Sequence, residues 1–132
     1  MENDFGHWLA GFIDGEGCFQ IVSNGGYYTP RFSVKVRADE KSIIERIRRK
    51  TGIGTITTYP YNGLKGNPQV NWNVNSRQDC RALSDLLDKY PLRAKKAADF
   101  AIWRQAARLT GRGHQAQLAA LRDDLKATRE YK

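Results

Sequence analysis

The chain is poor in the residues that form zinc sites and disulfide-rich scaffolds. It has two cysteines, Cys18 and Cys80, no CxxC pair, and two histidines, His7 and His114, that lie far apart. Zinc sites need several cysteine or histidine ligands at short spacings, and small disulfide-bonded folds carry a high density of cysteine. We therefore expect neither a zinc centre nor a disulfide, and because both cysteines lie in apolar-rich segments we interpret them as small reduced core residues.

Long hydrophobic segments are also absent. The sequence has no run of 18 apolar residues and does not open with a signal-peptide pattern, whereas a membrane-spanning helix needs roughly 20 apolar residues. We therefore expect an intracellular protein of one domain, residues 1–132, without a membrane partner. Arginine outnumbers lysine 13 to 9, which favours the cytoplasm or nucleoid of a bacterium or phage-infected cell, with an organelle as the alternative.

Positive charge is what the chain has in excess. It contains 22 lysine and arginine residues against 14 aspartate and glutamate residues, which gives a net charge of +8 and a pI of about 9.7. Such an excess favours a polyanionic partner, of which nucleic acid is the commonest.

The hydrophobic periodicity changes in an orderly way along the chain and predicts its elements. Residues 24–26 (Asn-Gly-Gly) are a strong hairpin signal, Asp39 and Ser76 are candidate helix N-caps, and Gly15 and Gly17 are candidate stop signals for the first helix. The expected helices are 3–13, 39–52, 76–90, 94–109 and 114–130, the expected strands are 18–23, 31–37, 55–61 and 69–75, and residues 62–68 form a loop.

This order, αββαββααα, predicts an α+β fold. It is an αββαββα arrangement that continues into an extra C-terminal helix, with a four-stranded antiparallel sheet covered by helices on one face. In the strands, Phe32, Val34 and Val36 alternate with polar residues, so one face of the sheet is apolar and the opposite face is polar.

The polar face has an unusual composition, because asparagine is normally depleted in strands. Asparagine and glutamine can bond the major-groove edge of adenine, and arginine or lysine can bond guanine. We therefore predict that this face binds DNA, although an ordinary solvated outer face is the alternative. Its residues are Gln20, Asn24, Arg31, Ser33, Lys35, Thr57, Tyr59, Gln69, Asn71 and Asn73.

Two acids stand where the first helix is expected to end. Asp14 and Glu16 lie at the negative end of the helix dipole, where an acid costs roughly 0.3–1 kcal/mol. Such an arrangement indicates that something positive faces these acids, either a basic partner or a metal ion.

The stretch LAGFIDGEG, from Leu9 to Gly17, closely resembles the signature of the LAGLIDADG homing endonucleases. Seven of the nine letters match when Phe12 is counted as a conservative change, and Glu16 stands where the signature has aspartate. The segment YPLRAKK, from Tyr90 to Lys96, is similar to the stretch that precedes a late helix in that family, and the element order agrees as well. The resemblance therefore spans nearly the whole chain.

The resemblance implies a metal-dependent site at the end of the first helix. Glu16 and the carbonyl of Gly15 would hold Mg²⁺, which Mn²⁺ is expected to replace, while Ca²⁺ is expected to bind without turnover. Lys95 best matches the family's active-site lysine, with Lys96 as the fallback. Asp14 is either a group behind the metal ligands or a capping and packing residue.

The resemblance also implies how the chain assembles and binds. A single motif implies a homodimer on a palindromic or nearly palindromic site, in which the motif helices pack side by side and each sheet forms half of a DNA-binding saddle. Arg37 and Lys41 match a region with polar residues that organise solvent, and phosphate contact or a surface role is the alternative for both. The residues that the resemblance places at the dimer interface are Leu9, Ala10, Gly11, Phe12 and Asp14.

The sequence therefore predicts a site-specific double-strand DNA endonuclease that hydrolyses phosphodiester bonds with Mg²⁺. The alternative on the same scaffold is a DNA-binding regulator that does not cut, or an RNA maturase. Retention of both Glu16 and Lys95 favours cutting, because a pure binder has no use for an anion beside a phosphate backbone.

Overall fold

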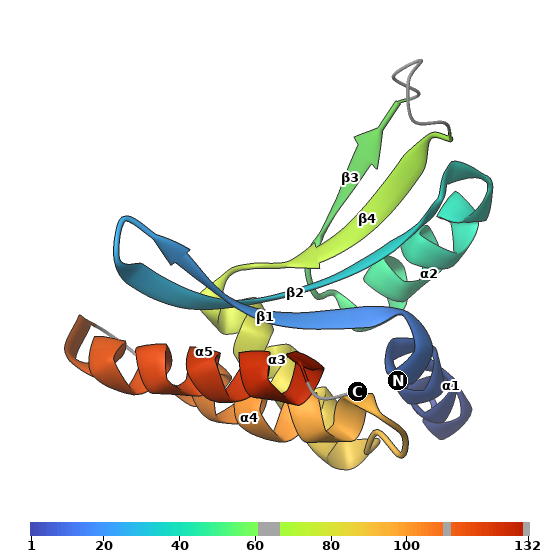
Figure 1. The fold of residues 1–132 in the computed structure, drawn as a ribbon. Coiled ribbons are helices and arrows are strands. Elements are labelled where there is room, and N and C mark those ends of the chain that lie inside the picture. The colour runs from blue at the N-terminus through green and yellow to red at the C-terminus, as the bar shows by residue number, and fades with distance from the viewer. Residues whose placement is uncertain (61–66, 110–111, 131–132) are drawn as a thin grey trace.

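The computed structural model of the 132-residue chain describes residues 1–60, 67–109 and 112–130. The element order αββαββααα and the α+β class are confirmed (Figure 1). The loop expected at 62–68 lies largely outside the described residues. The elements are α1 (Asn3–Glu16), β1 (Gly17–Asn24), β2 (Tyr27–Arg37), a 3-10 turn (Ala38–Glu40), α2 (Lys41–Thr51), β3 (Thr55–Tyr59), β4 (Gln69–Val74), α3 (Arg77–Lys89), α4 (Lys96–Arg108), a second 3-10 turn (Arg112–His114) and α5 (Gln115–Glu130).

The four strands form one antiparallel sheet in the order β1-β2-β4-β3. The β1–β2 hairpin turns at Gly25 and Gly26, whose positive φ angles of 62° and 84° are those of the tight turn that the Asn-Gly-Gly signal predicts. The sheet is curved, with α3, α4 and α5 beneath it and α2 beside β3 and β4 in Figure 1. The described helices thus all lie on one side, as the sequence predicts, and the concave side of the sheet faces away from them.

The core lies between the sheet and the helices, and aromatic rings fill it. Phe19 of β1 packs against Phe32 of β2 and against Trp103 of α4, with ring centroids 4.8 Å and 5.2 Å apart. The indole N–H of Trp103 lies 2.9 Å from the carbonyl oxygen of Arg31 and 3.1 Å from that of Gln20, and it donates to both. A buried indole needs such an acceptor, so this contact fixes α4 against the β1–β2 hairpin.

Two local signals act differently from their sequence-based interpretation. Gly15 lies inside α1, and Gly17 has extended φ and ψ angles of −77° and 154°, so neither glycine ends the helix by adopting a left-handed conformation. Gly17 is needed for space instead, because a Cβ there would lie 2.8 Å from the Phe32 ring and 2.9 Å from the Ile13 side chain.

Asp39 is not the N-cap of α2. It lies in the 3-10 turn that precedes the helix and approaches Arg37 at 4.0 Å. The N-cap expected at Ser76 is confirmed, because Ser76 accepts a hydrogen bond from the backbone N–H of Asp79 at 3.0 Å. Gly52, the last residue of the expected helix 39–52, ends α2 in the left-handed conformation.

Within the described residues, no helix is long and apolar enough to cross a membrane.

Two neighbouring glycines before β3 allow a matched test of backbone strain against steric conflict. Both have positive φ, 69° at Gly52 and 83° at Gly54, but a Cβ on Gly52 meets open space while one on Gly54 lies 2.6 Å from the Asn73 carbonyl oxygen and from Nε1 of Trp72. Gly52→Ala should lower the free energy of unfolding by about 1–2 kcal/mol through its backbone conformation. Gly54→Ala should cost about 1–3 kcal/mol more through the clash, as measured by urea unfolding. Equal losses at the two positions would contradict this assignment.

Candidate functional site

The polar residues of the four strands form continuous rows across the concave side of the sheet. In one row Lys35 of β2 lies opposite Asn71 of β4, which lies opposite Thr57 of β3. In the next row Arg37, Gln69 and Tyr59 are paired in the same way. Further rows are formed by Gln20 with Arg31, and by Cys18 with Ser33, Asn73 and Thr55.

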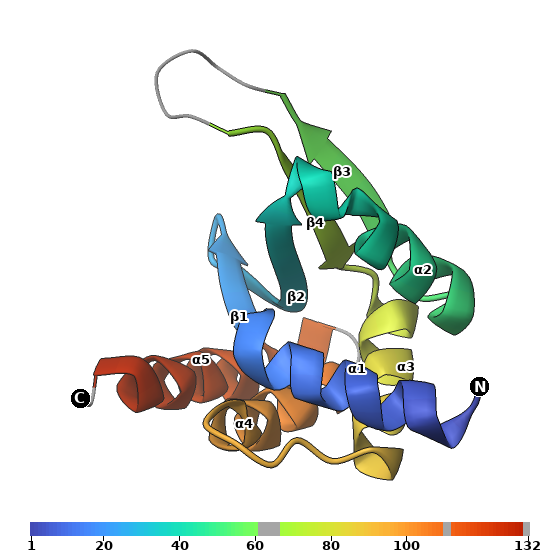
Figure 2. The same cartoon turned by 90° about the vertical axis from the view of Figure 1, so that its right-hand side faces the viewer.

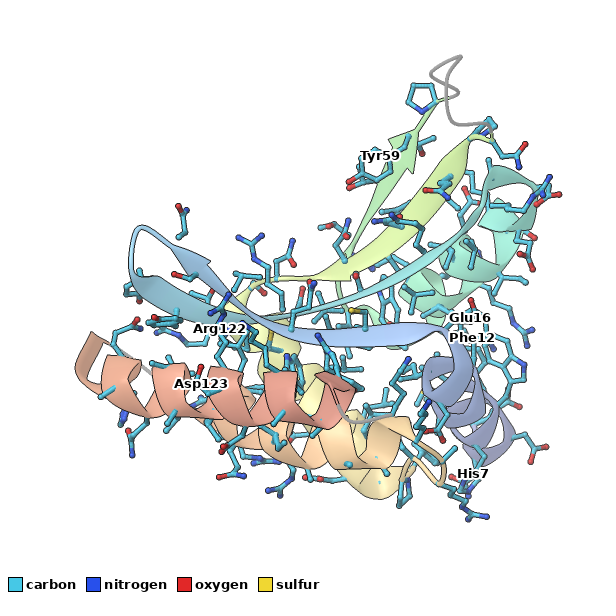
Figure 3. The ribbon with its side chains drawn as sticks, in the orientation of Figure 1. His7, Phe12, Glu16, Tyr59, Arg122 and Asp123 are labelled. Atoms are coloured by element: carbon cyan, nitrogen blue, oxygen red, sulfur yellow. The ribbon has the colours of Figure 1, made fainter. Side chains whose placement is uncertain are left out.

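Five of the ten residues predicted for this face are exposed, four are half-buried, and Asn71 is buried. Gln20, Arg31, Lys35 and Tyr59 are exposed, and Figure 3 shows Tyr59 pointing away from the helices. Asn71 is only 9% exposed, and its side-chain oxygen is buried without a hydrogen-bond partner among the described residues. Asn71 lies in the interior of the sheet and has neighbours on both sides, so it is less accessible than its alternation pattern indicates.

Three further predicted residues lie at the ends of the strands or beyond them: Asn24, Arg37 and Lys41. Arg37 and Asn24 are exposed and belong to β2 and β1, whereas Lys41 is the first residue of α2 and lies 4.0 Å from Glu45 on the same helix. Lys41 is therefore separate from the sheet rows. Cys18, which we expected in an apolar segment, is half-buried on the polar face opposite Ser33, so it is not a core residue.

Glu16 is the last residue of α1 and lies where the helix passes into β1 (Figure 3). Its side chain is exposed and forms no salt bridge in the described part of the chain. The N–H of Gly17 bonds the carbonyl of Ile13, and the later carbonyls of the helix, including that of Gly15, have no partner within it. A free carboxylate and free carbonyl oxygens thus lie together at the negative end of the helix dipole.

Asp14 takes a different direction from Glu16, although it is only two residues away. Its Oδ2 atom accepts hydrogen bonds from the backbone N–H groups of Arg93 at 2.8 Å and Ala94 at 3.2 Å, in the connection between α3 and α4. Figure 2 shows this connection running below α1. Of the two interpretations of Asp14, the capping role agrees with these contacts.

The two candidate lysines also point to different places. Lys96 is half-buried, and its Nζ donates a hydrogen bond to the carbonyl oxygen of Gly17, directly after Glu16. Lys95 is the exposed N-cap residue of α4 and makes no such contact with the end of α1. The structure therefore brings Lys96, the fallback of the sequence interpretation, to the end of the motif helix.

The interface residues expected on α1 fall into two groups. Leu9 is 0% exposed because its side chain faces the protein's own core, so it is not available for the contact predicted for it, whereas Ala10 is 3% exposed and lines a pocket beside α1. Gly11 is exposed, and Phe12 is half-buried and stacks on Trp8 with ring centroids 5.2 Å apart. Trp8, which the sequence interpretation missed, is 41% exposed.

The basic residues near the end of α2 mainly contact the protein itself. Arg46 and Lys50 lie over the Phe5 ring at 5.4 Å and 5.9 Å, and Nε of Arg48 donates to the carbonyl of Gly54 at 2.6 Å. These contacts hold the three side chains against the protein's own surface.

The donors around Glu16 suit a hard divalent cation but do not complete a site for one. Among the described residues, no group of three or more histidine, cysteine, aspartate or glutamate side chains is placed to hold a metal ion. Mg²⁺ is commonly bound through one or two carboxylates together with substrate phosphates and water. Glu16 and the last carbonyls of α1 fit such a partial site, which substrate or a second copy must complete.

Comparison with known proteins gives a consistent family assignment. The model of the LAGLIDADG endonuclease family matches residues 9–107, which is more than half of the chain. A curated relative described as a probable intron-encoded endonuclease Cox1-I1b, from Schizosaccharomyces pombe, is 27% identical over 138 residues. That match covers 96% of this chain and 35% of the relative, so the chain spans about a third of the relative's length.

Solved structures share the fold. The LAGLIDADG meganuclease I-AabMI bound to uncleaved DNA is 26% identical with a TM-score of 0.78, over 92% of this chain and 44% of that one. The archaeal intron-encoded homing endonuclease I-Vdi141I complexed with DNA is 24% identical with a TM-score of 0.80, over 99% of this chain and 88% of that one.

The two cysteines test which side of the sheet is accessible. Cys80 is fully buried and its S–H contacts the carbonyls of Val74 and Pro30 at 3.6 Å, and burial, with a smaller effect of the Asp79 charge, raises the pKa of this thiol to about 12. Because the thiolate is the reactive form, iodoacetamide at pH 8 should alkylate Cys18 in the folded protein and Cys80 only after unfolding. Peptide mass spectrometry measures both sites, and comparable alkylation of Cys80 in the folded protein would contradict the assignment.

Proposed function

Because this chain belongs to the LAGLIDADG endonuclease family, we propose that it is a site-specific DNA endonuclease that hydrolyses phosphodiester bonds as a homodimer. The observation that carries the proposal is the end of α1, where the exposed carboxylate of Glu16 has no salt-bridge partner among the described residues while the ammonium of Lys96 is held one residue further along the chain. A cation between this acid and a phosphate would give the unneutralised carboxylate a function.

The family's divalent metal would be held by Glu16 and the carbonyl oxygen of Gly15, and we propose Mg²⁺ as the physiological ion, with Mn²⁺ as a substitute. When bound, such a metal stabilises charge on the attacking and leaving oxygens of the phosphodiester. The position of the Glu16 carboxylate is set by α1, because the inner side of this helix is packed in the core.

Lys96 supplies positive charge beside this carboxylate. Its Nζ is held by the Gly17 carbonyl, so little ordering of the long side chain is left for the reaction itself. An ammonium has three donors, and those not used by Gly17 can face the phosphate. We propose that Lys96, rather than Lys95, offsets the charge that develops during hydrolysis.

The rows of polar residues on the concave side are the proposed DNA-binding surface. Gln20, Arg31 and Lys35 present amide, guanidinium and ammonium groups that suit base edges in the major groove. Arg37 at the end of β2 suits a phosphate, which positions the duplex without reading its sequence. Lys41 lies off the sheet on α2 and can reach only DNA that continues past the rows.

The glycines of α1 support a second copy as the partner of this helix. A Cβ on Gly6 would overlap the Tyr90 ring at 2.4 Å, so Gly6 is needed within the chain. A Cβ on Gly11 or Gly15 meets nothing within 4 Å, and both glycines reduce helix propensity by about 1 kcal/mol each relative to alanine. Small residues allow two helix backbones to approach closely, which explains their presence.

The two flanks of this glycine ridge are complementary. On one flank lies the Trp8–Phe12 stack, and on the other a pocket of about 360 Å³. When two parallel helices are related by a two-fold axis between them, each flank of one copy meets the opposite flank of the other. The aromatic flank would therefore face the partner's pocket, which is lined by His7, Ala10, Gly11, Asp14, Pro91 and Arg93.

The lengths of the structural neighbours agree with a homodimer on a palindromic or nearly palindromic target. This chain corresponds to less than half of I-AabMI and to most of I-Vdi141I. The fold thus occurs both within a longer chain and as a chain of about this size. A chain that carries one motif helix needs a second copy to present two acids to two DNA strands.

A non-cutting regulator or an RNA maturase on the same scaffold is the second candidate, which the free Glu16 carboxylate disfavours. The source of the chain has two candidates. The arginine content indicates a bacterium or phage, whereas the intron-encoded relative in fission yeast favours an organelle. The genomic context of the gene distinguishes these two sources.

Substitution of the motif glutamate separates cutting from binding. The target is first selected with Ca²⁺ from a library of randomised palindromic duplexes. Glu16→Gln should then lower the cleavage rate in Mg²⁺ by at least about 100-fold, because it removes the charged ligand, while the affinity in Ca²⁺ changes much less. Asp123→Asn, an exposed carboxylate on α5 (Figure 3), is the control and should cut normally. Normal cutting by Glu16→Gln would overturn the metal role, and specific binding without any cutting by the parent protein would indicate the regulator.

A bulky residue on the glycine ridge separates folding from dimerisation. Gly11→Leu should keep or slightly raise the thermal unfolding temperature, because the site is open within the chain and leucine has a higher helix propensity. It should nevertheless convert a dimer into a monomer in sedimentation experiments. Ala101→Leu, at an exposed position of α4, is the matched control and should remain dimeric. A Gly11→Leu dimer as stable as the parent dimer would contradict this interface.

A further inference from the structure

We propose that Asp14 is a positioning residue that acts through Lys96: its carboxylate holds the start of α4 against the end of α1 and so sets the place of the Lys96 ammonium beside Glu16. This inference rests on the proposed function. It assigns to the first acid of the motif a role separate from metal binding.

Two contacts connect the same two helix ends. From α1, Oδ2 of Asp14 accepts hydrogen bonds from the backbone N–H groups of Arg93 and Ala94. From α4, Nζ of Lys96 donates to the carbonyl oxygen of Gly17, the C-cap residue of α1. Glu16 lies between Asp14 and Gly17 in the chain, so the two contacts bracket it.

Each charged group is at the unfavourable end of its own helix and at the favourable end of the other. An acid in the last turn of α1 opposes that helix's dipole, but Asp14 is directed to the N-terminal side of α4, where partial positive charge lies. A lysine in the first turn of α4 opposes its dipole, but Lys96 is directed to the C-terminal side of α1. The exchange offsets both penalties, and Oδ1 of Asp14 stays buried without a hydrogen-bond partner among the described residues.

The start of α4 depends on this help because its own sequence does not supply a cap. The N-cap residue is Lys95, which makes no side-chain capping bond. A carboxylate oxygen that accepts two backbone N–H bonds forms charge-assisted hydrogen bonds, which are roughly twice as strong as neutral ones. The two N–H groups belong to residues that precede Lys95, so Asp14 holds the segment that leads into α4 rather than capping the helix itself, and without Asp14 this segment should lose its fixed position.

The rest of α4 does not rely on Asp14. Trp103 anchors the middle of the helix to the carbonyls of Gln20 and Arg31, and Phe100 packs on Phe19 at 5.6 Å. Removal of the Asp14 carboxylate should therefore loosen the first turn of α4 and leave the fold and the sheet intact.

The test is a double-mutant cycle between Asp14→Ala and Lys96→Met, with Lys95→Met as the matched control. Single-turnover cleavage of the selected duplex in Mg²⁺ should fall about 10- to 100-fold in each single variant of the cycle, as for other misplaced catalytic groups. If Asp14 acts through Lys96, the double variant should be no slower than Lys96→Met alone. Asp14→Asn, whose amide oxygen can still accept, should recover part of the rate, and Lys95→Met should cut normally.

Two further measurements do not depend on cutting. Hydrogen exchange of residues 91–97, followed by mass spectrometry on the free protein, should accelerate in Asp14→Ala and remain near the parent rate in Asp14→Asn. DNA affinity in Ca²⁺ should change less than about threefold, since the sheet is unaffected.

Three results would overturn the proposal: additive losses in the cycle, unchanged exchange at 91–97 in Asp14→Ala, or a larger rate loss in Lys95→Met than in Lys96→Met. Failure of the proposed function has a different signature, because Glu16→Gln would then have no effect on cleavage or the parent protein would not cut. The exchange experiment distinguishes the two cases, since it tests the Asp14 contact in the absence of metal and DNA.

Discussion

The arrangement of the site depends on the meeting of two helix ends of opposite polarity. The C-terminus of α1 and the N-terminus of α4 exchange charged groups, with Asp14 bonding the backbone at Arg93 and Ala94 and Lys96 bonding the Gly17 carbonyl. Each contact alone connects residues about eighty positions apart in the sequence. Because Asp14 and Lys96 bond each other's helix ends, Glu16 is the acid of this helix end that has no salt-bridge partner among the described residues, and we propose that the two carboxylates have different tasks.

The sheet and its aromatic core hold the C-terminus of α1 and the N-terminus of α4 in place. Trp103 ties α4 to β1 and β2 through two backbone carbonyls, and β1 begins at Gly17, directly after Glu16. The absence of a Cβ at Gly17 lets Phe32 and Ile13 close over the junction. The fully buried apolar side chains of the strands, such as Phe19, Phe32 and Val34, face this core, and the concave face carries polar side chains in rows. The fold thus separates the proposed DNA-binding surface from the packing that holds the candidate site.

The sequence was sufficient for features that depend on local pattern and insufficient for those that depend on distant contacts. Alternation and turn signals predicted the nine helices and strands in order, the Gly25-Gly26 turn and the Ser76 cap. The sequence did not predict that β2 begins at Tyr27. Gln115 of α5 holds this part of the strand through both the N–H and the carbonyl of Tyr28, and such a distant contact leaves no local pattern. The motif identified Glu16 and the neighbouring lysines, but the choice of Lys96 over Lys95 depends on a contact with Gly17 that no local pattern encodes.

The composition of the motif helix α1 follows from the different surroundings of its inner side, its end and its outer side. Its inner side carries Leu9 and Ile13, which are fully buried and hold the helix on the core. Its end carries Glu16, which must remain free for the proposed cation. Its outer side carries Gly11 and Gly15, which fill no requirement of the single chain and weaken the helix. A helix that carries two unneeded glycines must recover their cost elsewhere, and close packing against a second copy is the one proposed contact in which the missing side chains are an advantage. The same packing would relate the two Glu16 carboxylates by one two-fold axis, which is the symmetry that a palindromic duplex presents to the saddle.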